Sequence, residues 1–157
     1  MDMIRRTLLK GVGSTGVLAA ALAAGVLKPT GVWAAEWNRA AFEAKDLSVA
    51  MKGLGAAASG DSKDLLIKAP DIAENGAVVP VEVVSNIPNT ISIAVLVDKN
   101  PSPLSSAFDF AEGAMAEVSV RLKLSQTSNI KAVAKTADGK YYTAQKEVKV
   151  TVGGCGG

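Results

Sequence analysis

A chain of 157 residues with no histidine and a single cysteine has no imidazole base and no Cys/His cluster for zinc, haem or copper. Its carboxylates are scattered, and no glycine-rich loop precedes a predicted helix, as phosphate binding would require. The 17 basic and 15 acidic residues nearly balance. We therefore expect no cofactor, no metal ion and no catalytic residues, which argues against a self-sufficient enzyme.

The first 34 residues are typical of an export signal of the twin-arginine type. Arg5 and Arg6 precede a short, glycine-rich apolar run over residues 11–26. That run is shorter than the roughly 20 apolar residues that a membrane span needs. Small residues at its end predict cleavage after Ala34, or alternatively after Ala35. Cleavage after Ala34 leaves 13 basic and 14 acidic residues. The charge of the mature domain therefore gives no indication of a nucleic-acid or membrane surface. From the export signal we expect the protein in the periplasm.

Residues 35–64 are predicted to form an N-terminal helix followed by a linker. Apolar residues recur every three or four positions over 36–54, and Gly53 and Gly55 end the pattern. This single apolar stripe fits packing along the rest of the domain or against a partner subunit. The stretch 55–62 is rich in small residues, and we expect it to be a loop.

Over residues 65–152 the apolar period changes to two, which is typical of β-strands. The first predicted strand covers 65–69. A valine-rich strand follows over 77–85, where Pro80 predicts a sheet edge or a bulge. The nearly continuous apolar run 91–97 predicts a central strand that is buried on both faces.

The second half of this domain has the clearer pattern. Alternation over 118–124 gives one apolar and one polar face, and another strand is predicted over 130–136. Asp138-Gly139 predicts a tight hairpin, and the strand 141–152 returns with valines up to Val152 on one face. About seven short strands predict an antiparallel, immunoglobulin-like β-sandwich.

The segment 153–157, Gly-Gly-Cys-Gly-Gly, follows the last predicted strand and holds the only cysteine, Cys155. Glycine has no side chain to shield the sulfur, and its freedom in φ and ψ predicts a flexible arm. Four extended residues from Thr151 would carry Cys155 about 13–14 Å beyond the strand. A thiol without an internal disulfide partner in an exported protein is reactive or pairs with another molecule. The predicted site is the thiol of Cys155, carried on a flexible arm formed by Gly153, Gly154, Gly156 and Gly157.

Residues 149–157, Lys-Val-Thr-Val-Gly-Gly-Cys-Gly-Gly, resemble the C-terminal signature of SoxY, the family of sulfur-carrying subunits of the bacterial Sox complex. The resemblance extends through 69–80, the loop 97–101 and the turn 126–129. It implies a non-enzymatic periplasmic carrier that forms a heterodimer with a second β-sandwich subunit, SoxZ. Cys155 would hold thiosulfate and its oxidation intermediates while a c-type cytochrome, a sulfate-releasing hydrolase and a sulfur dehydrogenase act on them.

Three other interpretations are open. The protein can be an exported structural sandwich in which Cys155 only forms an intermolecular disulfide. Gly156 and Gly157 can act as in ubiquitin-like sulfur carriers, although that chemistry uses cytosolic ATP and the export signal argues against it. Redox catalysis would need the second cysteine of a Cys-x-x-Cys motif, which the chain lacks. We favour the covalent carrier.

Overall fold

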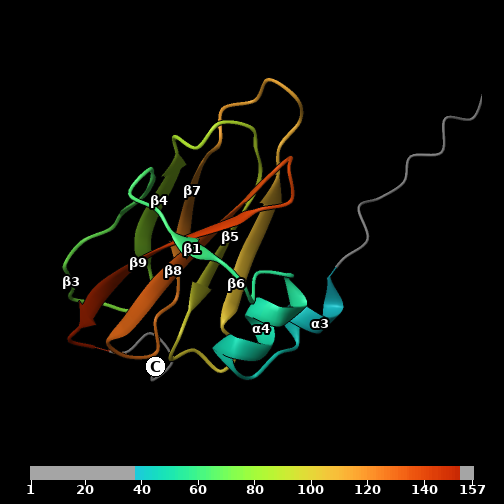
Figure 1. The fold of residues 1–157 in the computed structure, drawn as a ribbon. Helices are drawn as coiled ribbons and strands as arrows, with labels where there is room; N and C mark the ends of the chain where they lie inside the picture. The colour runs from blue at the N-terminus through green and yellow to red at the C-terminus, as the bar shows by residue number, and fades with distance from the viewer. Residues whose placement is uncertain (1–37, 153–157) are drawn as a thin grey trace, which may run out of the picture. The chain divides into compact units, whose positions relative to one another are not determined.

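Two facing β-sheets make up most of the computed structural model, which describes residues 38–152 (Figure 1). The predicted export signal and the Gly-Gly-Cys-Gly-Gly segment lie outside these residues. The described elements are α3 (Arg39–Phe42), α4 (Leu47–Gly53), β1 (Gly60–Asp61), β2 (Leu65–Lys68), β3 (Ile72–Ala73), β4 (Val79–Ser85), β5 (Thr90–Val97), β6 (Leu104–Asp109), β7 (Glu117–Leu122), β8 (Ser128–Thr136) and β9 (Tyr141–Val150).

The larger sheet has the order β1-β9-β8-β5-β6, and β3 also pairs with β9; the smaller sheet has the order β2-β4-β7. Neighbouring strands of four or more residues pair in the antiparallel sense, whereas the two-residue strands β1 and β3 pair with β9 in parallel. The seven strands of four or more residues within the described chain confirm the prediction of a β-sandwich of about seven strands.

Strand β5 lies between β8 and β6 and is buried on both faces, as the apolar run predicts. Ile93, Val95 and Val97 face the core between the two sheets. Ala94 and Leu96 point the other way, into a second cluster beneath the helices. Because successive side chains of a strand alternate between faces, an unbroken apolar run requires a layer on each side. The helices therefore form a third layer over the larger sheet (Figure 1).

The prediction of one helix over 36–54 is wrong in its continuity. Four residues separate α3 from α4, and Asp46 at the N-cap of α4 has the extended backbone of a helix start (φ −121°, ψ 143°). Aspartate is a favoured N-cap residue, so the sequence held a signal for this break that the apolar spacing concealed. The apolar stripe left two arrangements open, packing along the rest of the domain or against a partner subunit. In the structure the stripe packs along the sandwich.

The two helices approach each other closely at Gly53. A Cβ atom at this position would lie 2.9 Å from the Cα atom of Ala41, which is closer than real Cβ contacts. The Asn38 side-chain amide donates a hydrogen bond to the Gly53 carbonyl oxygen at 2.7 Å, and its Oδ1 accepts one from the Ala41 amide at 3.1 Å. Glycine is therefore required at position 53 for close contact between the helices, whereas the left-handed residue just after α4 is Gly55, with φ +78°.

Two short stretches differ from the predictions. The expected loop 55–62 contains β1, which extends the edge of the larger sheet beside Tyr142 and Thr143. Strand β6 was not predicted, because Leu104–Asp109 combines two serines with an acidic end and has only weak alternation. Its pairing with β5 stabilises it, since the ladder supplies hydrogen bonds that local sequence preference does not encode.

Pro80 lies in a strand that is central in its sheet, contrary to the prediction of an edge or bulged strand. However, β2 pairs with β4 only from Glu82 to Ser85, whereas β7 pairs with it from Val79 to Val84. At Pro80, β4 therefore pairs with β7 alone. On the side where β2 is absent, the N–H group that proline lacks leaves no ladder hydrogen bond unmade. Val79, Val81 and Val83 of this strand are buried in the sandwich core.

The hairpin between β8 and β9 forms at Asp138-Gly139, as predicted, with Gly139 at φ +81°. The Asp138 carboxylate accepts hydrogen bonds from Lys140 and from the Thr136 hydroxyl, and these interactions lower the pKa of Asp138 to about 2. This turn determines the register of β9, the strand that leads to the cysteine segment.

Candidate functional site

The predicted site residues, Cys155 and the four glycines around it, lie outside residues 38–152. The structure does describe the residues from which this segment starts. We call residues 149–152, together with the loop 71–78 beside them, the arm base. β9 ends at Val150, inside the arm base, and the chain continues to Val152 without regular structure.

Within the arm base, main-chain hydrogen bonds join the loop 71–78 to one side of residues 149–152. The Lys149 amide donates to the Asp71 carbonyl oxygen at 3.0 Å, and the Thr151 amide donates to the Ala73 carbonyl oxygen at 3.1 Å. One residue further on, the Gly76 amide donates to the Val152 carbonyl oxygen at 2.8 Å. These bonds extend the pairing of β3 with β9 by two residues, so Val152 is held although it lies beyond the strand.

Two side-chain contacts reinforce this attachment. The Thr151 hydroxyl donates to the Glu74 carbonyl oxygen at 2.9 Å. Lys146, whose side chain is 31% exposed, forms an ion pair with Asp71 at 3.0 Å and donates to the Ala69 carbonyl oxygen at 2.6 Å. Because Lys146 bridges β9 to the start of the loop, the loop is attached to β9 at both of its ends.

The turn 126–129 holds the opposite side of the arm base. The Val150 amide donates to the hydroxyl oxygen of Thr127 at 3.0 Å, which continues the β8–β9 ladder through a side chain. Val148 is fully buried in the sandwich core, and Val150 packs against the same core. Val152 differs from them in burial, because it is 63% exposed.

The loop 97–101 fixes the position of this turn. The Asp98 carboxylate accepts hydrogen bonds from the backbone amide and from the side-chain amide of Asn129, at 2.8 and 2.9 Å. Asn100 donates to the Lys123 carbonyl oxygen at 2.7 Å and accepts from the Ser125 amide at 3.2 Å. The loop therefore supports the turn from which Thr127 reaches the arm base.

The three segments that resemble the SoxY family thus meet at one end of the sandwich. Residues 69–80 include the loop of the arm base, 126–129 contact residues 149–152 through Thr127, and 97–101 supports that turn through Asn129. Sequence reasoning named these segments without predicting that they come together, and it assigned no role to Asp71, Thr127 or Asp98. The signal that could have found them is that all three segments share the resemblance with the cysteine segment.

The end of the arm base limits how far Cys155 extends from the domain. Cys155 lies three residues beyond Val152 in the sequence. At about 3.3–3.6 Å per residue this stretch spans at most about 10–11 Å. The arm length expected from the sequence, counted from Thr151, is about 13–14 Å. The arm is shorter because the hydrogen bond from Gly76 holds the chain as far as Val152, one residue further along.

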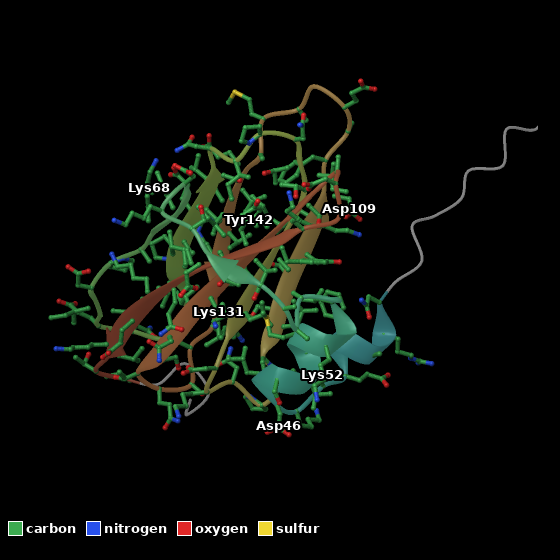
Figure 2. All side chains as sticks on the ribbon, viewed as in Figure 1. Asp46, Lys52, Lys68, Asp109, Lys131 and Tyr142 are labelled. Carbon is green, nitrogen blue, oxygen red and sulfur yellow. The ribbon has the colours of Figure 1, made fainter. Side chains whose placement is uncertain are left out.

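No metal-binding cluster accompanies the arm base within the described chain. Residues 38–152 contain no group of three His, Cys, Asp or Glu side chains that could hold a metal ion. Figure 2 labels charged residues at several elements: Asp46 and Lys52 at α4, Lys68 on β2, Asp109 on β6 and Lys131 on β8. Neither α3 nor α4 is long and apolar enough to cross a membrane.

A surface pocket lies at the opposite end of the sandwich. Its lining includes Thr90 at the start of β5, Ala137 after β8 and Phe110 after β6, and Glu112 is its only charged residue. The arm base adjoins the other ends of β8 and β9. The fold and the site therefore define a β-sandwich protein in which the segment with the only cysteine follows a strand end that is firmly held by hydrogen bonds.

Comparison with known proteins identifies the family. The family described as "Sulfur oxidation protein SoxY" matches residues 51–155. The structure of the sulfur carrier protein SoxY from Chlorobium limicola f thiosulfatophilum is 39% identical over 70% of this chain and 96% of that chain, with a TM-score of 0.62. The chain belongs to the SoxY family. Membership implies a carrier role in sulfur oxidation and partners of the Sox system such as SoxZ.

A more distant likeness concerns the fold alone. A superoxide reductase (neelaredoxin) from Ignicoccus hospitalis is 21% identical over 59% of this chain and 82% of that chain, with a TM-score of 0.50. At this identity the match indicates a shared β-sandwich and says nothing about activity. No curated protein matches the sequence.

Proposed function

We propose that this protein carries the intermediates of thiosulfate oxidation covalently on Cys155, in the periplasm, and presents them to other enzymes of the Sox system. The observation that carries the proposal is that the match to the SoxY family runs to Cys155 itself, the only cysteine of the chain. The twin-arginine pattern supports export of the carrier.

The chemistry needs one thiol and external catalysts. Loading joins the Cys155 sulfur to the outer sulfur of thiosulfate; one S–S bond forms, the thiol proton is released, and two electrons pass to a c-type cytochrome. Hydrolysis then adds water to the terminal sulfonate and releases sulfate and two protons, and it leaves a persulfide on Cys155. In this scheme the carrier supplies only the attachment point, and the partner enzymes supply the oxidant and the acid–base groups.

The arm base has a defined part in this proposal. It holds Val152 in place on the domain, so the thiol is delivered from a known point within about 10–11 Å. Gly153, Gly154, Gly156 and Gly157 carry no side chains, so the segment around Cys155 is slim enough for a narrow channel. The partners that we propose are a SoxZ-like subunit as heterodimer, the loading cytochrome, the hydrolase and a sulfur dehydrogenase.

The direct test is the intact mass of the mature protein from cells grown on thiosulfate, before and after treatment with a reductant. We expect mass increments of a thiosulfonate group and of single sulfur atoms that map to Cys155 and disappear on reduction. If the only reducible species is a disulfide between proteins, with the thiol otherwise bare during turnover, the structural interpretation replaces the carrier.

Gly154→Val should slow sulfate formation with the partner enzymes about tenfold, which corresponds to about 1.4 kcal/mol in activation free energy. A β-branched side chain next to Cys155 restricts the backbone and widens the segment. Gly60→Val is the matched control, because a Cβ atom at Gly60 meets nothing within 4 Å. Both variants should unfold at the same urea concentration as the unsubstituted protein. Equal turnover of Gly154→Val and Gly60→Val would contradict a role for the arm glycines.

A further inference from the structure

Strand β7 has a free edge. In the smaller sheet β4 lies between β2 and β7, so β7 pairs with a neighbour on one side only (Figure 1). The Ser85 amide donates to the Ala116 carbonyl oxygen, and the register of β4 with β7 is continuous from there on. Along an antiparallel ladder, successive residues point their N–H and C=O groups to opposite sides of the strand. The main-chain groups of Glu117, Ser119 and Arg121 therefore point away from β4.

Most main-chain groups on this edge have no hydrogen-bond partner within residues 38–152. They are the N–H groups of Ser119 and Arg121 and the C=O groups of Glu117, Ser119 and Arg121. The Glu117 N–H group is different, because it donates to the Met115 carbonyl oxygen at 2.9 Å. The side chains of Glu117, Ser119 and Arg121 are all exposed. A strand edge with unpaired main-chain groups is a template for a further strand.

The other outer strands of the two sheets have features that oppose such pairing. β1 and β3 cover parts of the edge of β9. β6 has a register shift where it pairs with β5, and β2 has only four residues and ends at Lys68. Bulges, short strands and lysine side chains each discourage pairing at an edge. β7 has six residues in continuous register, so its edge is the best suited to a further strand.

The charges on the β7 edge are arranged symmetrically about Ser119. Glu117 lies two residues before Ser119, and Arg121 lies two residues after it. Neither charged side chain forms an ion pair within residues 38–152. If a second β7 pairs antiparallel with Ser119 opposite Ser119, each Glu117 faces the Arg121 of the other copy. Opposite charges directly across a ladder stabilise it, whereas like charges destabilise it, so the edge is complementary to itself.

We propose that the β7 edge is the interface of a homodimer, in which two β7 strands pair antiparallel about Ser119. This is the self-complementary contact that a two-fold axis requires. The two Ser119 residues exchange main-chain hydrogen bonds, and the Arg121 N–H group of each copy donates to the Glu117 carbonyl oxygen of the other. The inference goes beyond the proposed carrier function and does not rest on it, and it concerns a contact separate from the proposed SoxZ-like partner.

The antiparallel arrangement places the two arm bases at opposite ends of the dimer. The Leu124 amide donates to the Gly76 carbonyl oxygen at 2.8 Å, so the C-terminal end of β7 adjoins the arm base. Each Leu124 lies five residues beyond Ser119. At about 3.3 Å per residue, the two Leu124 residues are about 33 Å apart along the strand direction. The interface therefore does not involve Cys155, and a reductant should leave the dimer intact.

The test is sedimentation velocity of the mature protein with a reductant present. A concentration of about 100 µM suits the weak association that a contact area below about 1,200 Å² supports. We expect the unsubstituted protein to be in equilibrium between monomer and dimer. Glu117→Arg and Arg121→Glu should each raise the Kd of the dimer about thirtyfold, because each turns two opposite-charge pairs into like-charge pairs. Glu147→Arg, at an exposed position of β9, is the matched control and should leave the Kd unchanged.

Mixing the two single variants gives the sharpest result. The Glu117→Arg variant carries two arginines on the β7 edge, and the Arg121→Glu variant carries two glutamates. Facing charges are therefore opposite only in the mixed dimer, which should form with a Kd close to that of the unsubstituted homodimer. The double variant that combines both substitutions exchanges the two charges, so it should also recover the homodimer.

Several results would overturn the proposed interface. They are a monomer in every sample at this concentration, single variants that dimerise as well as the control, and a weakened dimer that neither mixing nor the double variant restores. A dimer that disappears with the reductant would also overturn it, because the copies would then be joined through Cys155. Each of these results is independent of the mass increments expected on Cys155, so failure of the dimer is distinguishable from failure of the carrier function.

Discussion

Replacing Cys155 by serine should reduce thiosulfate-dependent sulfate formation by a reconstituted Sox system to the level of a reaction without this protein. Serine cannot form the S–S bond to thiosulfate, so no later step has a substrate. The chain has one cysteine, so no other thiol can substitute for it. The measurement is sulfate released per thiosulfate added, with the loading cytochrome, the hydrolase and the partner subunit present.

The stability of Cys155→Ser separates loss of chemistry from loss of fold. The core clusters consist of residues between 41 and 148, so the free energy of unfolding in urea should change by less than about 0.5 kcal/mol. Alkylation of the unsubstituted protein should give the same loss of sulfate formation, because it blocks the same single thiol. Normal sulfate formation by the serine variant would contradict covalent carriage on Cys155.

Leu96→Ala should destabilise the domain by about 2–5 kcal/mol. Leu96 is fully buried in the cluster between β5 and the helices, where Leu104 and Val133 from the neighbouring strands and the alanines of the helical layer surround it. Truncation leaves a cavity, because α3 and α4 already approach as closely as Gly53 permits. The total free energy of unfolding of a domain is about 5–15 kcal/mol, so this loss would be a large fraction of it. Urea unfolding followed by circular dichroism measures it.

The matched control is the same substitution on the exposed face of the smaller sheet. Leu66 in β2 is 41% exposed, so Leu66→Ala should cost less than about 1 kcal/mol. If the two leucine variants were equally stable, the helices would not cover the outer face of the larger sheet. Leu96→Ala should still accept sulfur on Cys155 at temperatures where it is folded, because the helical layer is separate from the arm base.

Much of the sandwich could be predicted because its strands and turns have strong local signals. The alternation over β7, the Asp138-Gly139 turn and the apolar run of β5 each depend on a few neighbouring residues. The two-sided burial of β5 follows from its composition alone, because an unbroken apolar run needs cover on both faces. The sequence did not say which elements supply that cover.

Elements with weak local signals depended on their neighbours. β6 contains serines and ends at Asp109, and it is a strand because β5 offers it a ladder. β1 is two residues long and exists because β9 has a free edge beside it. The break between α3 and α4 combines a local signal, Asp46, with a tertiary one, the close packing of both short helices on one sheet.

For the candidate site, too, some features follow from local sequence and others from tertiary structure. The sequence by itself supplied the candidate for the reactive group, because a single cysteine between glycines in a chain without histidine leaves one evident place for covalent chemistry. Only the tertiary structure decided where that chemistry starts. The segments 71–78, 97–101 and 126–129 are far apart in the chain, and antiparallel pairing brings them to one end of the sandwich around Thr151 and Val152. Local sequence does not encode this meeting, because it depends on which strand ends become neighbours when the two sheets pack.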